Sequence, residues 1–353
     1  MKEKYKLHQT TTKLLIQWFA LSDALIDTFG WFVVGLLFSQ SVMLSRIGAK
    51  IPLGTTLPSR TQRLWRWLKN DNIDSQSLAL CVARRWLMNF RQRTLYLVID
   101  RTDISNTHWL LFVGIAYRGR THPLIWQVLP GKGSTCFNRQ STLLKQIVPL
   151  IDESCTVVLV GDREFRSTAL MSFCDRNGWQ FRLRLKSDTY IRANHKWFQL
   201  RDLNLKPGER RYFQNVYITK NRRGPYHLAC CWLKGEDGPW YIATDQPACP
   251  RTLQEFDKRS YVEAMFSDFK KRGLNLEDTR IQNPQRIDRL MLVLVITYLL
   301  VTHQGMRCIR CGQRRFFEKT KTRFYSLARL GILFFEHLFD GGKAIHFALP
   351  RLC

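Results

Sequence analysis

The spacing of apolar residues changes several times along this 353-residue chain, and each change marks a different kind of element. Up to about residue 90, apolar positions recur every three or four residues, as in LLIQWFALSDALIDTF and SLALCVARRWLMNF, which predicts helices. From 91 to 186 the pattern predicts three consecutive strands, then a helix, a strand, a second helix and another strand. The sequence therefore predicts an α/β core that follows a helical region.

The second half of the chain changes its periodicity twice more. Strand-like runs such as RRYFQNVYITK and YHLACCWLK return between 187 and 250, which predicts an all-β insertion. The pattern is helical again from 251 to 304, and residues 305–353 are basic with one amphipathic run, FYSLARLGILFFEHLF. Three meandering strands followed by crossover helices are typical of a ribonuclease-H-like mixed sheet with flanking helices. We expect five regions: helices at 1–90, the two parts of this core at 91–186 and 251–304, the insertion at 187–250 and a helical end at 305–353.

The apolar runs and the cysteines indicate where in the cell the protein is located. The runs Trp31–Phe38 and Leu290–Val301 are shorter than the roughly 20 residues that span a membrane, so we expect buried helices and no membrane partner. The ten cysteines show no secreted disulfide framework, which favours a reducing cytoplasm. Cys308 and Cys311 form a CxxC pair near His303, but a structural zinc site needs four ligands and no second pair is present.

The net charge of the chain indicates what kind of partner it binds. Fifty-five Lys and Arg against 28 Asp and Glu give a formal net charge of +27, which favours a polyanionic partner, nucleic acid above all. Arg60, Arg63, Arg66 and Lys69 step by three and would line one helix face, as a phosphate-contacting surface requires. An ordinary solvated face explains this spacing equally well. We therefore predict a helical DNA-binding domain at 1–90 with that alternative open.

Two aspartates stand where apolar strands end. Asp100 follows TLYLVI and Asp162 follows TVVLVG. Functional groups gather at the carboxyl ends of strands in such sheets, so the two carboxylates would lie side by side if their strands are neighbours. Paired carboxylates suit Mg²⁺. Asp103 and Glu164 are weaker candidates for the same ligand role.

A third carboxylate occurs in the helical segment after the insertion. Phe256, Arg259, Glu263 and Lys270 fall within a sector of roughly 60° on one helix face. A scissile phosphate bound to metal ions needs a carboxylate together with cations, as this face provides. The alternative is a structural salt bridge from Arg259 to Glu263. Asp268 lies on a different face, and we expect it to be solvated.

Three motifs together resemble a known family. They are IDRTD around Asp100, GDREF around Asp162 and FDKRSYVEAMFSDFK. The chain resembles bacterial insertion-sequence transposases of the DDE class, in the IS-four family marked by a tyrosine, arginine, glutamate and lysine signature with two, three and six intervening residues. Phe256 replaces the signature tyrosine and lacks its hydroxyl. The resemblance also covers the basic helical start, including SRTQRLWRWL, and the β insertion.

The resemblance implies a set of roles. The metal-binding catalytic triad would be Asp100, Asp162 and Glu263, with Mg²⁺ as the cofactor and Mn²⁺ as a substitute. Arg259 and Lys270 would hold DNA phosphates near the cut, and Phe256 would pack there. The implied chemistry is two-metal phosphoryl transfer to water or to a DNA 3′-hydroxyl. Family members commonly cut through a DNA hairpin, for which Trp240 is a candidate to stack a flipped base, although a core tryptophan is the alternative.

The resemblance also implies partners. These are double-stranded DNA, as terminal repeats and as target, and a second copy of the chain in a homodimer on DNA. The run FYSLARLGILFFEHLF is either a subunit contact or part of the core. Two other functions are compatible with the sequence. One is a ribonuclease-H-like DNA nuclease without strand transfer, and the other is an inactive DNA-binding relic.

Overall fold

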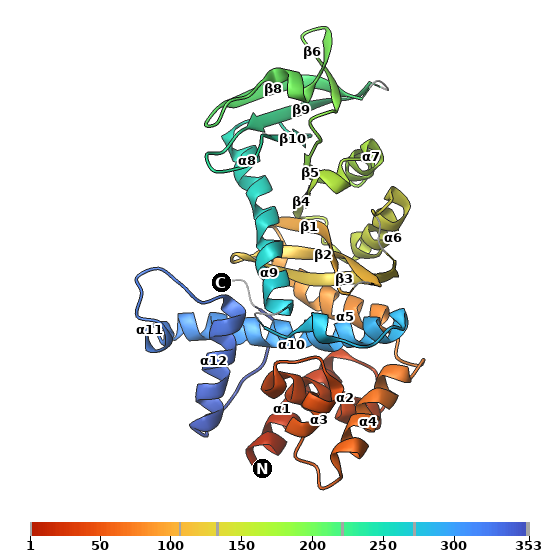
Figure 1. Cartoon of the computed structure of the whole chain (residues 1–353), viewed down its shortest axis with the longest axis vertical. Coiled ribbons are helices and arrows are strands. Elements are labelled where there is room, and N and C mark those ends of the chain that lie inside the picture. The colour runs from red at the N-terminus through yellow and green to blue at the C-terminus, as the bar shows by residue number, and fades with distance from the viewer. Residues whose placement is uncertain (1, 106, 132–133, 220–221, 271–272, 351–353) are drawn as a thin grey trace.

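The computed structural model describes residues 2–105, 107–131, 134–219, 222–270 and 273–350. Figure 1 shows an elongated molecule, with the N-terminal helices at one end, a twisted sheet reaching the other end, and one long helix across the middle. The parts of the chain that precede and follow the insertion come together around the same sheet, so the site is built from segments far apart in sequence.

Five helices form the N-terminal part, as the apolar periodicity predicts. They are α1 (Lys2–Trp18), α2 (Asp23–Ser39), α3 (Leu44–Lys50), α4 (Leu57–Lys69) and α5 (Ser75–Leu87). Local capping fixes two of their starts, because the Thr56 side chain accepts from the Ser59 N–H and the Asp74 side chain accepts from the N–H groups of Gln76 and Ser77. The run Trp31–Phe38 lies in α2 and is almost entirely buried, which confirms the buried helix.

Ten strands form one mixed sheet in the order β3-β2-β1-β4-β5-β10-β9-β8-β6-β7. The core strands are β1 (Thr94–Asp103), β2 (His108–Tyr117), β3 (Arg120–Pro130), β4 (Thr156–Gly161) and β5 (Gln180–Arg184). The pairs β3-β2 and β2-β1 are antiparallel, and β1-β4 and β4-β5 are parallel. This is the ribonuclease-H-like arrangement that the order of elements predicts.

The β insertion continues the core sheet. Its strands are β6 (Tyr190–Ala193), β7 (Lys196–Gln199), β8 (Arg210–Ile218), β9 (Arg223–Cys231) and β10 (Trp240–Thr244). Because β10 pairs antiparallel with β5, the insertion adds its strands to the same hydrogen-bonded sheet. The predicted strands are confirmed, and the continuous sheet connects the insertion directly to the core strands.

Helices cover both faces of the sheet. In Figure 1, α6 (Phe137–Ile147) and α7 (Thr168–Arg176) lie on one side, and α8 (Pro250–Asp257) and α9 (Tyr261–Phe269) run along the other. Short 3-10 turns connect the elements at Met88–Phe90, Val148–Leu150, Arg163–Phe165, Leu200–Leu203, Lys258–Ser260 and Leu276–Asp278. The last helices are α10 (Pro284–Arg310), α11 (Arg314–Phe317) and α12 (Leu327–Asp340).

The long helix α10 is the centre of the core. It packs between the N-terminal helices and β3, and although it is long and apolar enough to cross a membrane, 89% of its most apolar window is buried inside the protein. Helices α2 and α3 pass the same test only together, and they are bent by 96°. The predicted burial of Leu290–Val301 is confirmed.

The C-terminal apolar run packs inside this chain. Helix α12 crosses α10 so closely that a Cβ on Gly305 would lie 2.1 Å from the Leu327 carbonyl oxygen, and one on Gly331 would lie 1.9 Å from the Val301 carbonyl oxygen. Only glycine fits such a crossing. The buried apolar residues of α12 support core packing as the role of this run.

Candidate active site

The two aspartates lie side by side on neighbouring parallel strands. The register pairs Ile99 of β1 with Gly161 of β4, so Asp100 and Asp162 each follow the last paired position. A Cβ on Gly161 would lie 2.9 Å from the Phe165 Cβ, so glycine permits the tight turn that starts at Asp162. The adjacency that the sequence analysis assumed is present. Strand β1 continues beyond Asp100, because its pairing with β2 extends to position 103.

Asp100 is a buried carboxylate with an incomplete set of partners. Its side chain is 8% exposed, and the Arg101 N–H donates to Oδ1 at 2.7 Å. Its Oδ2 has no hydrogen bond, and the nearest cation is Arg259 Nη2 at 3.1 Å. Burial raises the pKa of Asp100 to about 6, opposed by the charge of Arg259 and assisted by the charge of Asp162. The protein thus keeps an acid here in an environment that disfavours its charged form.

Arg259 joins the third carboxylate to the pair. Its Nη1 lies 2.6 Å from Glu263 Oε1, and its Nη2 lies 3.6 Å from Asp162 Oδ2. The Glu263 side chain is 66% exposed. The structural salt bridge weighed in the sequence analysis is therefore present, and the same guanidinium also lies between Asp100 and Asp162. All three acids of the predicted triad converge on this one cation.

The segment that carries Arg259 and Glu263 is a broken helix. Helix α8 ends at Asp257, a 3-10 turn follows at Lys258–Ser260, and α9 begins at Tyr261. Helix α8 is held on the sheet by Glu255, which accepts from Arg182 Nε at 2.8 Å and from the Tyr96 hydroxyl at 3.1 Å. These contacts to β5 and β1 position the segment that carries Arg259 and Glu263 near the strand ends.

Two predictions about the shared helix face need correction. Lys270 lies just beyond the end of α9, and its Nζ pairs with Glu277 at 3.0 Å. Phe256 is 2% exposed and packs edge-on against Trp240, with ring centroids 5.4 Å apart. The 3-10 turn interrupts the helical period, so the four residues do not form one continuous face. In this structure Phe256 is a core residue, packed against Trp240.

Trp240 and Arg184 lie next to this core. Trp240 is half-buried, and the Arg184 guanidinium lies 5.4 Å from its ring centroid. Arg184 Nη1 also lies 3.8 Å from Asp162 Oδ1, and burial lowers its pKa. The register pairs Gly161 with Leu183, so Arg184, the last residue of β5, and Asp162 each come one position after the last β4–β5 pair. Sequence reasoning missed this site residue, although its place at the end of the QFRLR strand was a usable signal.

The alternative acids are engaged elsewhere. Glu164 accepts from Arg101 Nε at 2.6 Å and from the Thr135 N–H at 2.7 Å, so it braces the strand end. Asp103 is exposed, 3.7 Å from Arg101. Asp268 was expected to be solvated, and this was wrong. It is 5% exposed and accepts from Arg120 and from Ser326, and both partners are distant in sequence.

The triad has the chemistry of a divalent cation site. Asp100 Oδ2 and Asp162 Oδ1 are buried acceptors with no hydrogen bond, and hard oxygen ligands of this kind suit Mg²⁺ or Mn²⁺. As the side chains stand, no group of three or more His, Cys, Asp or Glu among the described residues is arranged to hold a metal ion. Arg259 lies between the three carboxylates and pairs with each of them.

The arginines predicted to line α4 have different environments. Arg60 donates to the Ile51 carbonyl, and Arg63 pairs with Asp27 and donates to Thr28 Oγ1 at 3.0 Å. Arg66 is exposed. Among these three arginines, only Arg66 is exposed to solvent, as expected of a side chain that binds a phosphate.

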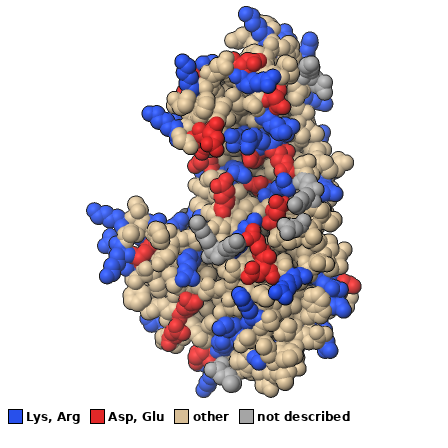
Figure 2. All heavy atoms as spheres, in the orientation of Figure 1, with Lys and Arg blue, Asp and Glu red and all other residues tan. Residues whose placement is uncertain are grey.

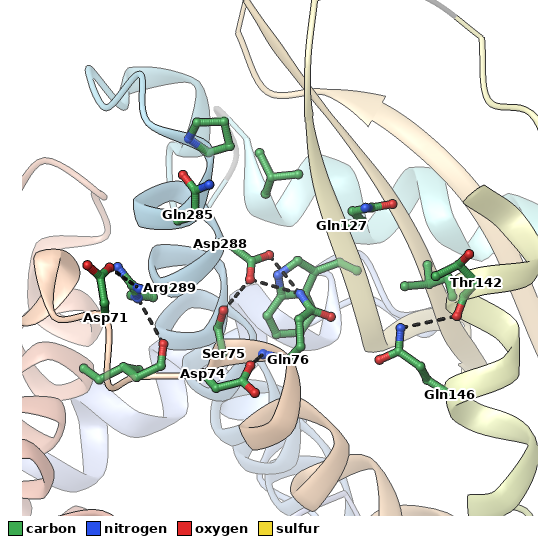
Figure 3. Close-up of a pocket in the computed structure, with 15 residues that line it drawn as sticks. Asp71, Asp74, Ser75, Gln76, Gln127, Thr142, Gln146, Gln285, Asp288 and Arg289 are labelled. Carbon is green, nitrogen blue, oxygen red and sulfur yellow. Dashed lines mark hydrogen bonds and ion pairs between the residues drawn. The ribbon is translucent and has the colours of Figure 1, made fainter. Parts of the chain in front are cut away.

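A cavity of about 440 Å³ lies apart from the triad, between the α4–α5 connection, β3, α6 and α10. Figure 3 shows that Asp288 points toward Ser75 and Gln76, and it accepts from both. Burial raises the pKa of Asp288. No residue of the predicted triad lines this cavity.

A comparison with known proteins agrees with this geometry. The sequence model of the family described as transposase DDE domain matches residues 96–300, which is more than half of the chain. The match begins in β1 and ends in α10, so it includes Asp100, Asp162 and Glu263. No curated protein matches the chain.

Proposed function

The chain belongs to the transposase DDE domain family, and we propose that it is an insertion-sequence transposase of the IS-four group that cuts element ends and joins them to target DNA. The observation that carries this proposal is the convergence of Asp100, Asp162 and Glu263 on a single cation at the carboxyl ends of adjacent strands. The family supports a DNA-acting enzyme. We further propose that the chain cleaves DNA, that it joins the cut ends to target DNA, and that it belongs to the IS-four group.

Asp100, Asp162 and Glu263 would hold the divalent ions, with Mg²⁺ as the expected metal and Mn²⁺ as its substitute. Such ions activate an attacking hydroxyl and stabilise the leaving oxygen of an in-line displacement at phosphorus. The protein contributes the position of the acids. Strand pairing fixes two of them, and the contacts of Glu255 fix the helical segment that carries the third.

The cations of the site would bind the scissile phosphate. Arg259 has a guanidinium that can leave the carboxylates for a phosphate, because its contacts with them are ion pairs that a divalent cation replaces. Arg184 is a second phosphate ligand within reach of Asp162. Lys270 remains a predicted phosphate ligand, and in that role it would exchange Glu277 for DNA. Trp240 remains the candidate for stacking a flipped base.

The partners follow from the same reaction. They are double-stranded DNA, as terminal repeats and as target, and a second copy of the chain, because paired ends must be held together for coordinated cutting. We also propose a bacterial cytoplasmic location for the protein.

We propose the following division of the chain into regions. They are a DNA-binding region at 1–90, a core at 91–186 and 251–304, an insertion at 187–250 and a helical end at 305–353.

The test is cleavage of linear DNA that carries the element's own terminal repeats, in Mg²⁺, with joining into a plasmid followed on the same gel. We expect the wild-type chain to cut and join, and Glu263→Ala to do neither while still binding DNA. Cutting without joining would show a nuclease. Binding without cutting by the wild-type chain would show an inactive relic. Full activity of Glu263→Ala would remove Glu263 from the triad.

A further inference from the structure

Two phenylalanine rings are exposed on one short segment near the C-terminus. Phe316 is 71% exposed and Phe324 is 79% exposed, and these are the two most exposed large hydrophobic side chains among the described residues. Both belong to the segment 314–324, which contains α11 and projects from the side of the molecule in Figure 1. Exposure of a whole aromatic ring to water is unfavourable, so a pair of them on one projection marks a contact surface.

The same segment carries more positive than negative charge. Three of its side chains, Arg315, Lys319 and Lys321, are exposed and form no ion pair with the described residues. Arg323 is different, because burial lowers its pKa and the charges of Glu318 and Asp268 act on it. Its single acid, Glu318, is buried and pairs with Arg314 at 2.8 Å. Figure 2 shows Lys and Arg side chains on the lobe that α11 forms in Figure 1. A cluster of free cations complements a polyanion.

The segment is a structured loop. Glu318 accepts from the N–H groups of Phe324 and Tyr325 at 3.0 and 2.7 Å, which closes the loop on itself. Arg314 Nη2 donates to the Lys321 carbonyl at 3.0 Å from inside the same loop. These hydrogen bonds hold the backbone of the loop, so the Cα positions of the two phenylalanines and of the cations are set by the fold.

The base of the loop is tied to the catalytic helix. Ser326 Oγ donates to Asp268 Oδ1 at 2.8 Å, and Asp268 lies in the last turn of α9. Glu263 is five residues earlier in α9, about 7.5 Å along the axis at about 1.5 Å per residue. The loop therefore starts next to the helix that carries Glu263.

We propose that this aromatic and basic loop, residues 314–324, is a binding site for duplex DNA beside the catalytic centre. Its exposed cations Arg315, Lys319 and Lys321 bind backbone phosphates, and Phe316 and Phe324 lie against the sugars and bases of the groove. The chemistry is that of nucleic-acid surfaces which combine cations with aromatic side chains. The inference rests on the proposed function, because it assigns a further site for the same DNA substrate.

The test is the salt dependence of binding to a fluorescein-labelled duplex of about 40 base pairs and mixed sequence, measured with the full-length protein. Each lost phosphate contact lowers the slope of log K against log salt by about 0.9, so Lys319→Ala with Lys321→Ala should lower it by about 1.8. Phe324→Ala should weaken binding roughly fivefold or more with the slope unchanged. Lys145→Ala on α6 and Trp197→Ala on β7, where Trp197 is 36% exposed, are the controls for charge and for apolar area outside the proposed DNA-binding region.

Unchanged slope and affinity in the loop variants, with wild-type binding intact, would overturn the loop site and leave the proposed function standing. Failure of the wild-type chain to bind the duplex would instead overturn the proposed function. A photoreactive phenylalanine analogue at position 324 provides a readout that does not depend on the stability of the variants. Crosslinking to DNA supports the inference, and crosslinking to a second copy of the chain, or to added anionic vesicles in place of DNA, contradicts it.

Discussion

Replacement of Asp100 by asparagine should stabilise the metal-free protein at neutral pH. The pKa of this buried acid is raised from 3.8 to about 6, so its charged form is less favourable in the folded chain than in the unfolded chain. At about 1.36 kcal/mol per pKa unit, this corresponds to about 3 kcal/mol of stability lost when the group ionises. Asparagine has nearly the same shape and removes the charge.

The sign of the pH dependence follows from the same shift. Because the folded state binds this proton more tightly, stability falls as the pH rises from about 4 to about 6, and the whole cost is present above about 6. The gain from Asp100→Asn should therefore be about 3 kcal/mol at neutral pH and should vanish toward pH 4. Its measurement is urea unfolding in EDTA, followed by tryptophan fluorescence.

A control and a metal titration complete this experiment. Asp103→Asn changes an exposed carboxylate on the same strand and should alter stability by no more than about 0.5 kcal/mol. Mn²⁺ at about 100 times its Kd should stabilise the wild-type chain by about 2.7 kcal/mol and Asp100→Asn much less. If Asp100→Asn instead destabilises the metal-free chain at neutral pH, the ion pair with Arg259 outweighs the burial cost, and the reasoning is refuted.

Three further substitutions test the framework around the site by urea unfolding. Phe256→Ala should cost about 3–5 kcal/mol because the ring is buried against Trp240, and a cost below about 1 kcal/mol would contradict this core role. Glu164→Ala should cost about 1–3 kcal/mol because it strips Arg101 of its partner, and an unchanged midpoint would show that the brace is unimportant. Gly331→Ala should cost at least about 1–3 kcal/mol because its Cβ has no room against α10, so normal stability would argue against this crossing.

The periodicity of apolar residues was sufficient to predict the order of helices and strands and two residues of the candidate site. Uninterrupted apolar runs end at Asp100 and Asp162, and such runs identify buried parallel strands whose ends share one edge. The end of the QFRLR strand was a signal for Arg184, but its approach to Asp162 depends on the register between β4 and β5, which no local pattern encodes. Because the buried residues Phe181 and Leu183 alternate along β5, Arg184 lies on the opposite face of the sheet from them. This pattern does not show which residues Arg184 contacts there.

Other features depended on contacts between distant segments. Phe256 was placed with Arg259 on the assumption of one unbroken helix, and the 3-10 turn at Lys258–Ser260 changes that geometry. Asp268 is buried because Ser326, 58 residues later, and Arg120, 148 residues earlier, approach it. Sequence spacing along one helix carries no information about such partners.

The central claim is that Asp100, Asp162 and Glu263 together hold the catalytic metal ions. The most direct measurement replaces Mg²⁺ with Fe²⁺ in the protein–DNA complex, generates hydroxyl radicals with ascorbate and peroxide, and maps the backbone cuts by mass spectrometry. We expect cuts within a few residues of all three acids, suppressed by excess Mg²⁺ and lost in Asp162→Asn. Cuts confined to other acids, such as Asp71, Asp74 and Asp288 around the separate cavity, would contradict it.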